Sequence, residues 1–384
     1  MAVHGTAGDV RVGLLVNTFD LLFGEKAGGH VHFLEVAKRW RDLDVWIFAP
    51  EFARATIERE LPGATFVAMP AGRWLRNFQL RNLWRTIASI TRVRELRSCD
   101  ILLATSHFVP DVVPAALARR SPFVVCIQHV LKPANERPGP RLPNIISSVF
   151  QEVAFRIIRA SASAILVNSP DVATRIGVDR QSVAVHVMTH GVDHVHRSDV
   201  PDARSNADAL YLGRLVPTKG LEDLLAAWPS IARASAGARL TIAGAGDAPY
   251  ERRLKDIARR IPSSRPIEFL GRVDEEVKAR CFERSSIFLF PSKEEGWGIA
   301  IAEAMSFGLP CVVYDLPAYR NVFVAGCLVA PVGDVDRFAA LAISLLTDDN
   351  LRARLAAEAS ELARTFSWDV AAEIERRALA GVLG

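Results

Sequence analysis

Short hydrophobic runs recur along the chain and alternate with segments of helical periodicity. They lie at residues 10–16, 45–49, 101–105, 123–127 and 164–168, and then at 209–213, 239–244, 267–271, 287–290 and 311–314. Each run is apolar at consecutive positions, which is typical of parallel strands covered by helices on both faces. The pattern predicts an α/β protein built from two doubly wound, Rossmann-like domains in tandem.

A polar stretch without hydrophobic periodicity separates the two halves. We expect a first domain over residues 1–198, a linker over 199–207 and a second domain over 208–365. Residues 366–384 carry an amphipathic helical pattern with no strand after it, so this segment is expected to cross back to the first domain.

Composition limits the class of partner and the compartment. A net charge of +4 is a mild basic excess, which argues against a nucleic-acid partner. The cysteines are odd in number, at five, and are expected to be free thiols in a reducing cytosol. The chain starts without a secretion signal, and no apolar run reaches the ~20 residues that span a bilayer. A cytoplasmic location follows, with peripheral contact at the inner face of the membrane as a further expectation.

One cationic loop directly follows a strand of the second half. The segment GRLVPTKG carries Arg214 and Lys219, and it precedes a helical stretch. Loops of this kind lie at the carboxyl edge of a parallel sheet, where ligands bind. A forked guanidinium and a mobile ammonium together suit a diphosphate without a metal ion. The alternative is a pair of solvated loop charges.

A second loop, in FPSKEEGWGIAIAEAMSFGLPCVVYD (290–315), carries acid instead. A helix that starts near Gly298 would point unpaired N–H groups toward this loop, where an anion could bind. Glu295 would flank that point and Glu303 would lie one to two turns into the helix. Carboxylates beside an anion site are explained if they accept hydrogen bonds from ligand hydroxyls, so the ligand should carry both phosphate and sugar. The alternatives are that Glu295 compensates Lys293 and that Glu303 is a solvated helix carboxylate.

Together, these two segments resemble the retaining glycosyltransferases of family 4, whose two-domain architecture is called GT-B. Glu295 and Glu303 meet the family's Glu-x7-Glu spacing. The resemblance covers the whole second domain. It extends more loosely to Gly28-Gly29, the strand that ends at His129 and the turn at residues 190–193.

The resemblance implies a role for each matching residue. Arg214 and Lys219 would bind the donor diphosphate, Glu295 the transferred sugar and Glu303 the ribose. Further donor contacts would come from the backbone of Gly298, Ile299 and Ala300, from Arg272 and Val273 at the base, and from Gly29, which lets its loop approach closely. His129 would be the active-site histidine. His107 is its rival, since it also follows a strand.

These assignments predict a metal-independent hexosyltransferase. It would move a sugar from a nucleotide diphosphate sugar, with retention, to a hydroxyl of a glycan or glycolipid acceptor, and the donor would be a substrate rather than a cofactor. Such an activity belongs to polysaccharide or cell-envelope biosynthesis. The alternatives are a nucleotide-sugar epimerase and a non-catalytic binding protein on the same fold.

Two remaining patterns qualify this prediction. The Asp-x-Asp pairs at residues 42–44 and 334–336 lie at predicted helix boundaries, which favours capping over metal binding. The loop at residues 316–320 lacks the glycine pair that many relatives have after the preceding strand.

Residues 73–97 form a separate basic and aromatic segment. It holds seven arginines and two tryptophans against the single acid Glu95. A helix with a basic face beside aromatic residues suits an anionic membrane. The alternative is a solvated helix whose aromatic residues pack inward.

Overall fold

The structure is a computed structural model that describes residues 10–18, 28–75, 77–128, 130–137, 141–178, 183–193, 208–235, 237–262 and 265–383. The chain divides into two compact units, one formed by Met1–Gly191 with Trp368–Gly384 and the other by Val192–Ser367. The expected linker at 199–207 lies outside the described residues.

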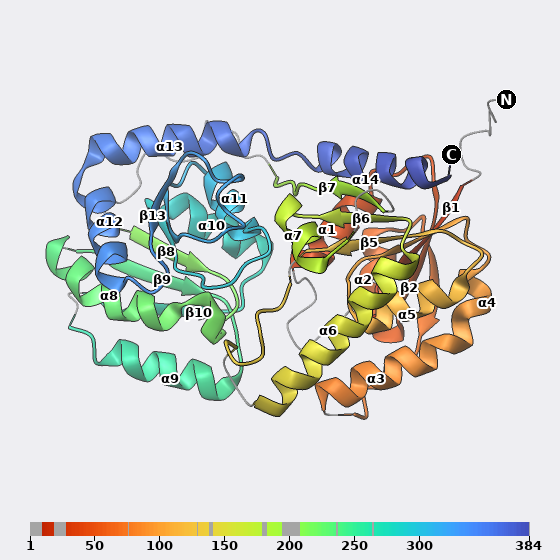
Figure 1. Ribbon diagram of the computed structural model, residues 1–384. Coiled ribbons are helices and arrows are strands. Elements are labelled where there is room, and N and C mark those ends of the chain that lie inside the picture. Colours follow the sequence, from red (N-terminus) through yellow and green to blue (C-terminus); the bar gives the residue numbers. More distant parts are fainter. Residues whose placement is uncertain are drawn as a thin grey trace. The chain divides into compact units, whose positions relative to one another are not determined.

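The first unit is built on a parallel sheet of seven strands in the order β3-β2-β1-β4-β5-β6-β7 (Figure 1). These strands are β1 (Arg11–Leu15), β2 (Asp44–Pro50), β3 (Thr65–Met69), β4 (Ile101–Ala104), β5 (Phe123–Ile127), β6 (Ala164–Val167) and β7 (Ala184–Val187). In the central register, Val12 pairs with Val45 on one side and with Ile101 on the other. The central strands are buried throughout, as their continuous apolar runs predict.

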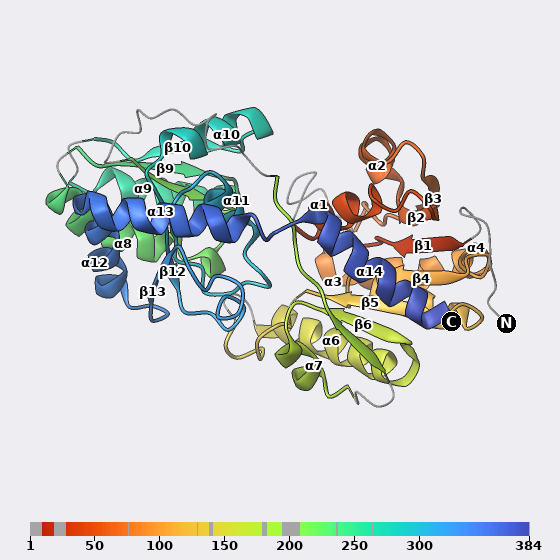
Figure 2. The ribbon, with the colours of Figure 1, turned by 90° about the horizontal axis from the view of Figure 1, so that it is seen from above.

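Helices cover both faces of this sheet. They are α1 (Gly28–Ala37), α2 (Arg54–Glu60), α3 (Phe78–Ala88), α4 (Val93–Leu96), α5 (Val109–Ala118), α6 (Arg141–Ser161), α7 (Pro170–Ile176) and α14 (Trp368–Leu383). One hydrophobic cluster includes side chains of α1, α2 and α14, and a second includes side chains of α4, α5, α6 and α7. Helix α14 lies beside α1 (Figure 2), and the indole of Trp40 donates to the carbonyl oxygen of Ala372 at 3.1 Å.

The second unit repeats this arrangement with a parallel sheet of six strands in the order β10-β9-β8-β11-β12-β13. Its strands are β8 (Asp208–Leu212), β9 (Arg239–Ala243), β10 (Glu268–Gly271), β11 (Ile287–Phe290), β12 (Cys311–Tyr314) and β13 (Cys327–Ala330). Its helices are α8 (Leu221–Ala234), α9 (Ala248–Arg259), α10 (Glu275–Arg284), α11 (Ile299–Ser306), α12 (Val335–Thr347) and α13 (Asp349–Ala363). A single hydrophobic cluster fills this unit.

The predicted fold class is confirmed: two parallel sheets, each with interleaved helices, form a two-domain Rossmann-like architecture. Strand order reverses between β1 and β4 in the first sheet and between β8 and β11 in the second. Loops at the carboxyl ends of such strands form the usual ligand edge. Among the described helices, none combines the length and the apolar composition that a membrane crossing needs.

Candidate functional site

The two loops singled out from the sequence meet at the switch point of the second sheet. One follows β8 and the other follows β11, the strands between which the order reverses. The backbone N–H of Lys293 donates to the carbonyl oxygen of Thr218 at 2.8 Å, and the hydroxyl of Ser292 donates to the same oxygen at 3.3 Å. The loops are therefore joined through backbone atoms and form one ligand edge.

Gly220 makes this close approach geometrically possible. Its φ is 71°, and a Cβ built at this position would lie 1.8 Å from the carbonyl oxygen of Pro291. No other residue fits there without moving the loop, because both the backbone conformation and the space exclude a side chain. The GRLVPTKG segment thus ends in a glycine that is required by packing as well as by turn geometry.

Lys219 and Glu295 form an ion pair between the two loops. Their side chains are only 12% and 13% exposed, and the ammonium lies 5.7 Å from the ring centroid of Phe290. The side chain of Arg214 is exposed on the same loop as Lys219, and the hydroxyl of Tyr211 holds the Arg214 carbonyl oxygen at 3.1 Å. The structure therefore brings together two of the predicted donor residues and places the third on the same loop.

The ammonium of Lys293 pairs with Asp223, and not with Glu295 as the alternative explanation of Glu295 requires. Its ammonium lies 2.8 Å from a carboxylate oxygen of Asp223 on α8, and the hydroxyl of Tyr314 donates to the other oxygen at 2.8 Å. The alternative in which Glu295 compensates Lys293 is therefore wrong. Asp223 instead ties the first turn of α8 to the Glu295 loop.

Helix α11 begins directly after Gly298, as the sequence predicts. Gly298 has a φ of 108°, and a Cβ there would lie 2.8 Å from Phe323 and 3.0 Å from Tyr319. The N–H groups of Ile301 and Ala302 already bond to the Gly298 carbonyl oxygen. The N–H groups of Ile299 and Ala300, two residues earlier in each case, belong to the first turn, which has no helical acceptors for them. They are available to an anionic ligand.

The loop at residues 316–320, which departs from the family pattern, supports this helix start. The ring of Tyr319 packs beneath Gly298 and is buried, and burial raises the pKa of its hydroxyl. Arg320 donates to both carboxylate oxygens of Asp315, at 3.0 and 2.9 Å. This loop therefore provides an aromatic support for the helix start and carries an internal ion pair.

Glu303 lies on α11 and is held by a residue that the sequence analysis did not identify. The ammonium of Lys278, on α10, lies 2.8 Å from Glu303 and 2.6 Å from Glu275. Burial raises the pKa of Glu303, and the nearby Lys278 limits that rise. The alternative of a freely solvated helix carboxylate is wrong. Nothing in the EEVKAR segment signals this contact, because it joins residues 25 positions apart.

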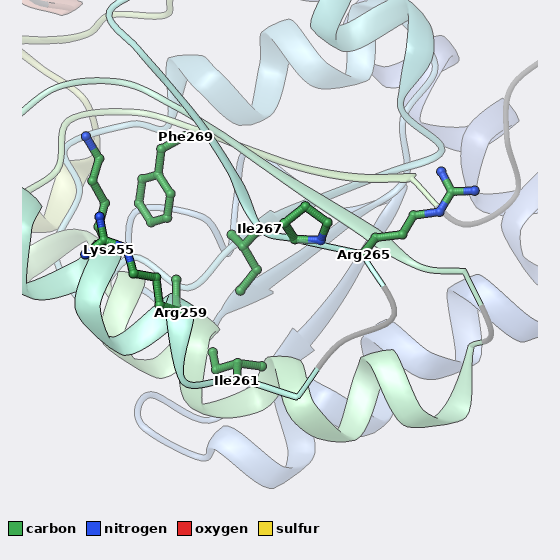
Figure 3. Close-up of a pocket in the computed structure, with 8 residues that line it drawn as sticks. Lys255, Arg259, Ile261, Arg265, Ile267 and Phe269 are labelled. Atoms are coloured by element: carbon green, nitrogen blue, oxygen red, sulfur yellow. The ribbon is translucent and has the colours of Figure 1, made fainter.

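Arg272 and Val273 follow the edge strand β10. Gly271 before them has a φ of 69° with open space around its Cβ position, Arg272 is exposed and Val273 is half-buried. A shallow cavity of about 460 Å³ lies nearby, between α9 and β10, and is lined by Lys255, Arg259, Arg265, Ile267 and Phe269 among others (Figure 3). None of the predicted donor residues lines this cavity.

The predicted residues of the first unit are described only in part. His129 lies outside the described residues, but Gln128 before it is adjacent to Gly29, where a Cβ would lie 2.8 Å from the Gln128 amide oxygen. The rival His107 is 2% exposed and stacks on Phe155 with ring centroids 5.4 Å apart. That environment is typical of a core histidine, and the assignment of His129 as the active-site histidine stays a prediction.

The acidic pairs have structural roles. Asp334 accepts a hydrogen bond from the N–H of Arg337 at 2.9 Å and so caps α12. Asp44 bonds to the guanidinium of Arg11 at 2.8 Å. Within the described ranges, no three His, Cys, Asp or Glu side chains gather as a metal site.

The sequence comparisons agree with this geometry. Residues 196–362 match the family model described as glycosyl transferases group 1. A phosphatidyl-myo-inositol mannosyltransferase of Mycolicibacterium smegmatis is 36% identical over 192 residues, which are 48% of each chain. A GDP-mannose-dependent monoacylated alpha-(1-6)-phosphatidylinositol monomannoside mannosyltransferase of Corynebacterium glutamicum is 32% identical over 42% of this chain and 43% of its own. The matches therefore span about half the length of these curated relatives.

Solved structures extend the similarity to nearly the whole chain. HepE of Anabaena, crystallised with UDP and glucose, has a TM-score of 0.75 at 18% identity and covers 97% of this chain and 100% of its own. WaaG, a glycosyltransferase involved in lipopolysaccharide biosynthesis, has a TM-score of 0.75 at 15% identity, covering 96% and 100%. Identity at this level shows the shared fold. The resemblance inferred from the motifs is confirmed: the chain has the two-domain GT-B fold, and its residues 196–362 match the glycosyl transferases group 1 family model.

Proposed function

We propose that the protein is a retaining, metal-independent glycosyltransferase that moves a hexose from a nucleotide diphosphate sugar to a hydroxyl of a glycan or glycolipid. The observation that supports this most is the meeting of Lys219, Glu295 and the start of α11 at one switch point. The cation and the first-turn N–H groups suit a diphosphate, and the carboxylate suits the hydroxyls of a sugar.

These residues suit the separation of charge in a transfer reaction. The bond between the anomeric carbon and the diphosphate oxygen breaks, a bond to the acceptor oxygen forms on the same face, and the acceptor proton passes to the departing phosphate. Lys219 and Arg214 would stabilise the developing negative charge, which is the kind of electrostatic contribution that fixed cations make. Arg272 and Val273 would line the base, Glu303 would bind the ribose, and His129 would lie near the acceptor and sugar.

The names of the relatives suggest which donor sugar and which acceptor to test first. The relatives described above are mannosyltransferases that act on phosphatidylinositol or its mannoside, and one of them is GDP-mannose-dependent by name. GDP-mannose and a phosphatidylinositol-type lipid are therefore the first donor and acceptor to test. A glycolipid acceptor would bring a cytoplasmic enzyme to the inner face of the membrane.

Nucleotide binding followed by transfer tests the proposal. UDP, GDP and ADP are titrated into the protein, and labelled GDP-mannose and UDP-glucose are then supplied with candidate acceptors, with and without chelator. Transfer that survives the chelator and is lost in Lys219→Ala and Glu295→Ala supports the proposal. Epimerised donor, or binding without turnover on any acceptor, supports one of the two alternatives and overturns it.

A further inference from the structure

Helix α3 buries polar side chains and exposes apolar ones, which is the reverse of an ordinary surface helix. Its buried residues are Arg81, Asn82 and Arg85. Its apolar side chains face solvent with exposures between 40% and 54%, namely Phe78, Leu80, Leu83, Trp84 and Ile87. No side chain of this fully described helix belongs to either hydrophobic cluster of the first unit. A helix on the surface of a soluble domain normally buries its apolar stripe, so this face points to a partner.

Hydrogen bonds hold the polar face of α3 against the rest of the first unit. The guanidinium of Arg85 is 1% exposed and donates to the carbonyl oxygens of Ala71 at 2.8 Å and Asn17 at 3.2 Å. Rotating the helix to bury its apolar face would remove these acceptors from a buried cation, which is costly. Arg85 therefore binds the protein itself, and Arg81, the other arginine of the helix, is buried as well. The earlier alternative, in which the aromatic residues of this segment pack inward, is wrong.

Helix α6 carries a second exposed apolar stripe. It contacts α3, and both helices pack against α5 on the same flank of the first unit (Figure 1). It exposes Leu142, Ile145, Val149 and Val153, between 40% and 67%, at spacings of three and four residues that form one stripe. Trp74, at 71% exposure, lies against Trp84 with ring centroids 5.6 Å apart. We call these residues of α3 and α6, together with Trp74, the outer apolar surface.

The charges around the outer apolar surface favour an anionic partner. Arg73 and Arg94 are exposed in the segments that precede and follow α3, and Arg141 is exposed at the start of α6. Arg97 is also exposed, but its guanidinium donates to the carbonyl oxygens of Ala118 and Leu117. The only acid within residues 73–97, Glu95, is already paired with Arg92 at 2.9 Å. Exposed tryptophan and aliphatic side chains bordered by arginine are the composition that binds an anionic lipid surface.

Helix α3 links the outer apolar surface to the carboxyl edge of the first sheet, where the acceptor is expected to bind. Through Arg85, the helix is bonded to Asn17, which follows β1 at the switch point between β1 and β4. We propose that the outer apolar surface inserts into the headgroup boundary of an anionic membrane and so presents a lipid-borne acceptor to the carboxyl edge of the first sheet. This inference rests on the proposed function for the nature of the acceptor, while the docking itself rests on the two helices.

Vesicle co-sedimentation tests the docking without any turnover. The full-length protein is mixed with phosphatidylcholine vesicles, with and without about one-third phosphatidylglycerol. We expect binding to the anionic vesicles that is weakened but not abolished at ~1 M salt, because salt screens the arginines and not the apolar contact. The double variant Leu83→Glu with Ile87→Glu should lose about tenfold in partitioning for each side chain.

Two controls carry the same change to exposed valines elsewhere. Val370 on α14 is 50% exposed in the same unit, and Val324 is 70% exposed in the other. Val370→Glu and Val324→Glu should bind vesicles like the wild type, and Leu83→Met with Ile87→Met should also retain binding. All variants should unfold at the same denaturant concentration, since none of the replaced side chains is buried.

Several results would overturn the inference. The first is that the wild-type protein does not bind anionic vesicles, and the second is that the double variant binds them as well as the controls do. The third is that the wild type forms a dimer without binding vesicles and the double variant is a monomer. The last result would assign the surface to a second copy of the chain. Nucleotide titration of the same samples separates the two proposals: docking with no nucleotide binding would sink the proposed function alone.

Discussion

Lys219 and Glu295 pair across two loops, and the pair occupies the position expected for the donor diphosphate and sugar. A diphosphate that binds Lys219 must therefore compete with a carboxylate already in place. Removing the Glu295 charge should strengthen the binding of nucleoside diphosphates by about fivefold, or about 1 kcal/mol, because a nearby negative charge disappears. The same change should slow transfer, since a neutral amide oxygen accepts hydrogen bonds from the sugar hydroxyls less strongly than a carboxylate does.

Calorimetric titration of Glu295→Gln with UDP, GDP and ADP measures this effect, with transfer assayed in parallel. Lys219→Met is the matched variant and should weaken the same binding by about 2 kcal/mol, because a charge-assisted contact to phosphate is lost. Equal losses of diphosphate affinity in both variants would show that the pair serves folding rather than the donor.

Lys278 is a positioning residue for Glu303 on this interpretation. Burial raises the pKa of Glu303 and Lys278 opposes the rise, so in Lys278→Met the carboxylate should take up a proton at higher pH than in the wild type. Nucleoside diphosphate affinity should then fall earlier as the pH is lowered. Inorganic pyrophosphate, which has no ribose, should show the same pH profile in both proteins. A shift in the pyrophosphate profile would indicate a general disturbance of the site.

Gly220 offers a test of the loop contact itself. In Gly220→Ala the Cβ meets the Pro291 carbonyl oxygen, so we expect a loss of at least about 3 kcal/mol in the free energy of unfolding. Gly237→Ala is the control, because its φ of 83° is equally unfavourable but nothing lies within 4 Å of its Cβ position. That variant should lose only about 1 kcal/mol. Urea denaturation of both proteins gives the comparison. Similar losses would mean that the contact with the Pro291 carbonyl oxygen adds nothing to the cost of the substitution.

The C-terminal helix is held to α1 by a buried pair. Glu375 bonds to His32, each side chain is 2% exposed, and the ring of His190 lies 4.3 Å from that of His32. Glu375→Ala should cost about 3 kcal/mol, because the imidazole is left buried without its partner. Glu373→Ala, on the same helix but with exposed arginine partners, should cost less than about 1 kcal/mol. Chemical denaturation distinguishes the two, and equal losses would contradict a special role for the buried pair.

The interior strands could be read from the sequence because both of their faces are buried. Strands β3, β7 and β13 were missed, and all three lie at the edge of a sheet. Their burial is only partial, and His186 interrupts β7; β3 and β13 are largely apolar but short, and the sequence analysis did not identify them as strands. The apolar pattern therefore identified every interior strand and the edge strand β10, and it missed the other three edge strands.

The site shows the same division between local and distant information. The sequence predicted the loop cations, the acids and the start of α11, because each depends on residues close in the chain. The partners Lys278 for Glu303 and Asp223 for Lys293 come from other helices, 25 and 70 positions away. Helix α3 shows the limit most clearly, since its amphipathic pattern was evident but only its contacts show that Arg85 lies inside.

The buried carboxyl of Asp111 should make the free energy of unfolding depend on pH. It is fully buried on α5 and accepts hydrogen bonds from the N–H of Asn17 at 2.7 Å, from Thr18 at 2.9 Å and from Ser106 at 2.5 Å. Burial raises its pKa from 3.8 to about 7, against these donors. The unfolded chain therefore ionises at a lower pH than the folded one.

The sign of the effect follows directly. This contribution to stability is fully present below pH 4, is lost as the pH rises toward about 7 and changes little above it. Its full size is about 4 kcal/mol, at 1.36 kcal/mol for each unit of pKa. Asp111→Asn keeps an acceptor for Asn17 and does not ionise, so the difference in unfolding free energy between wild type and variant should shift in favour of the variant by this amount between pH 4 and pH 8. Urea denaturation across that range measures it, and a difference that does not change with pH would show that Asp111 is ionised in the folded protein.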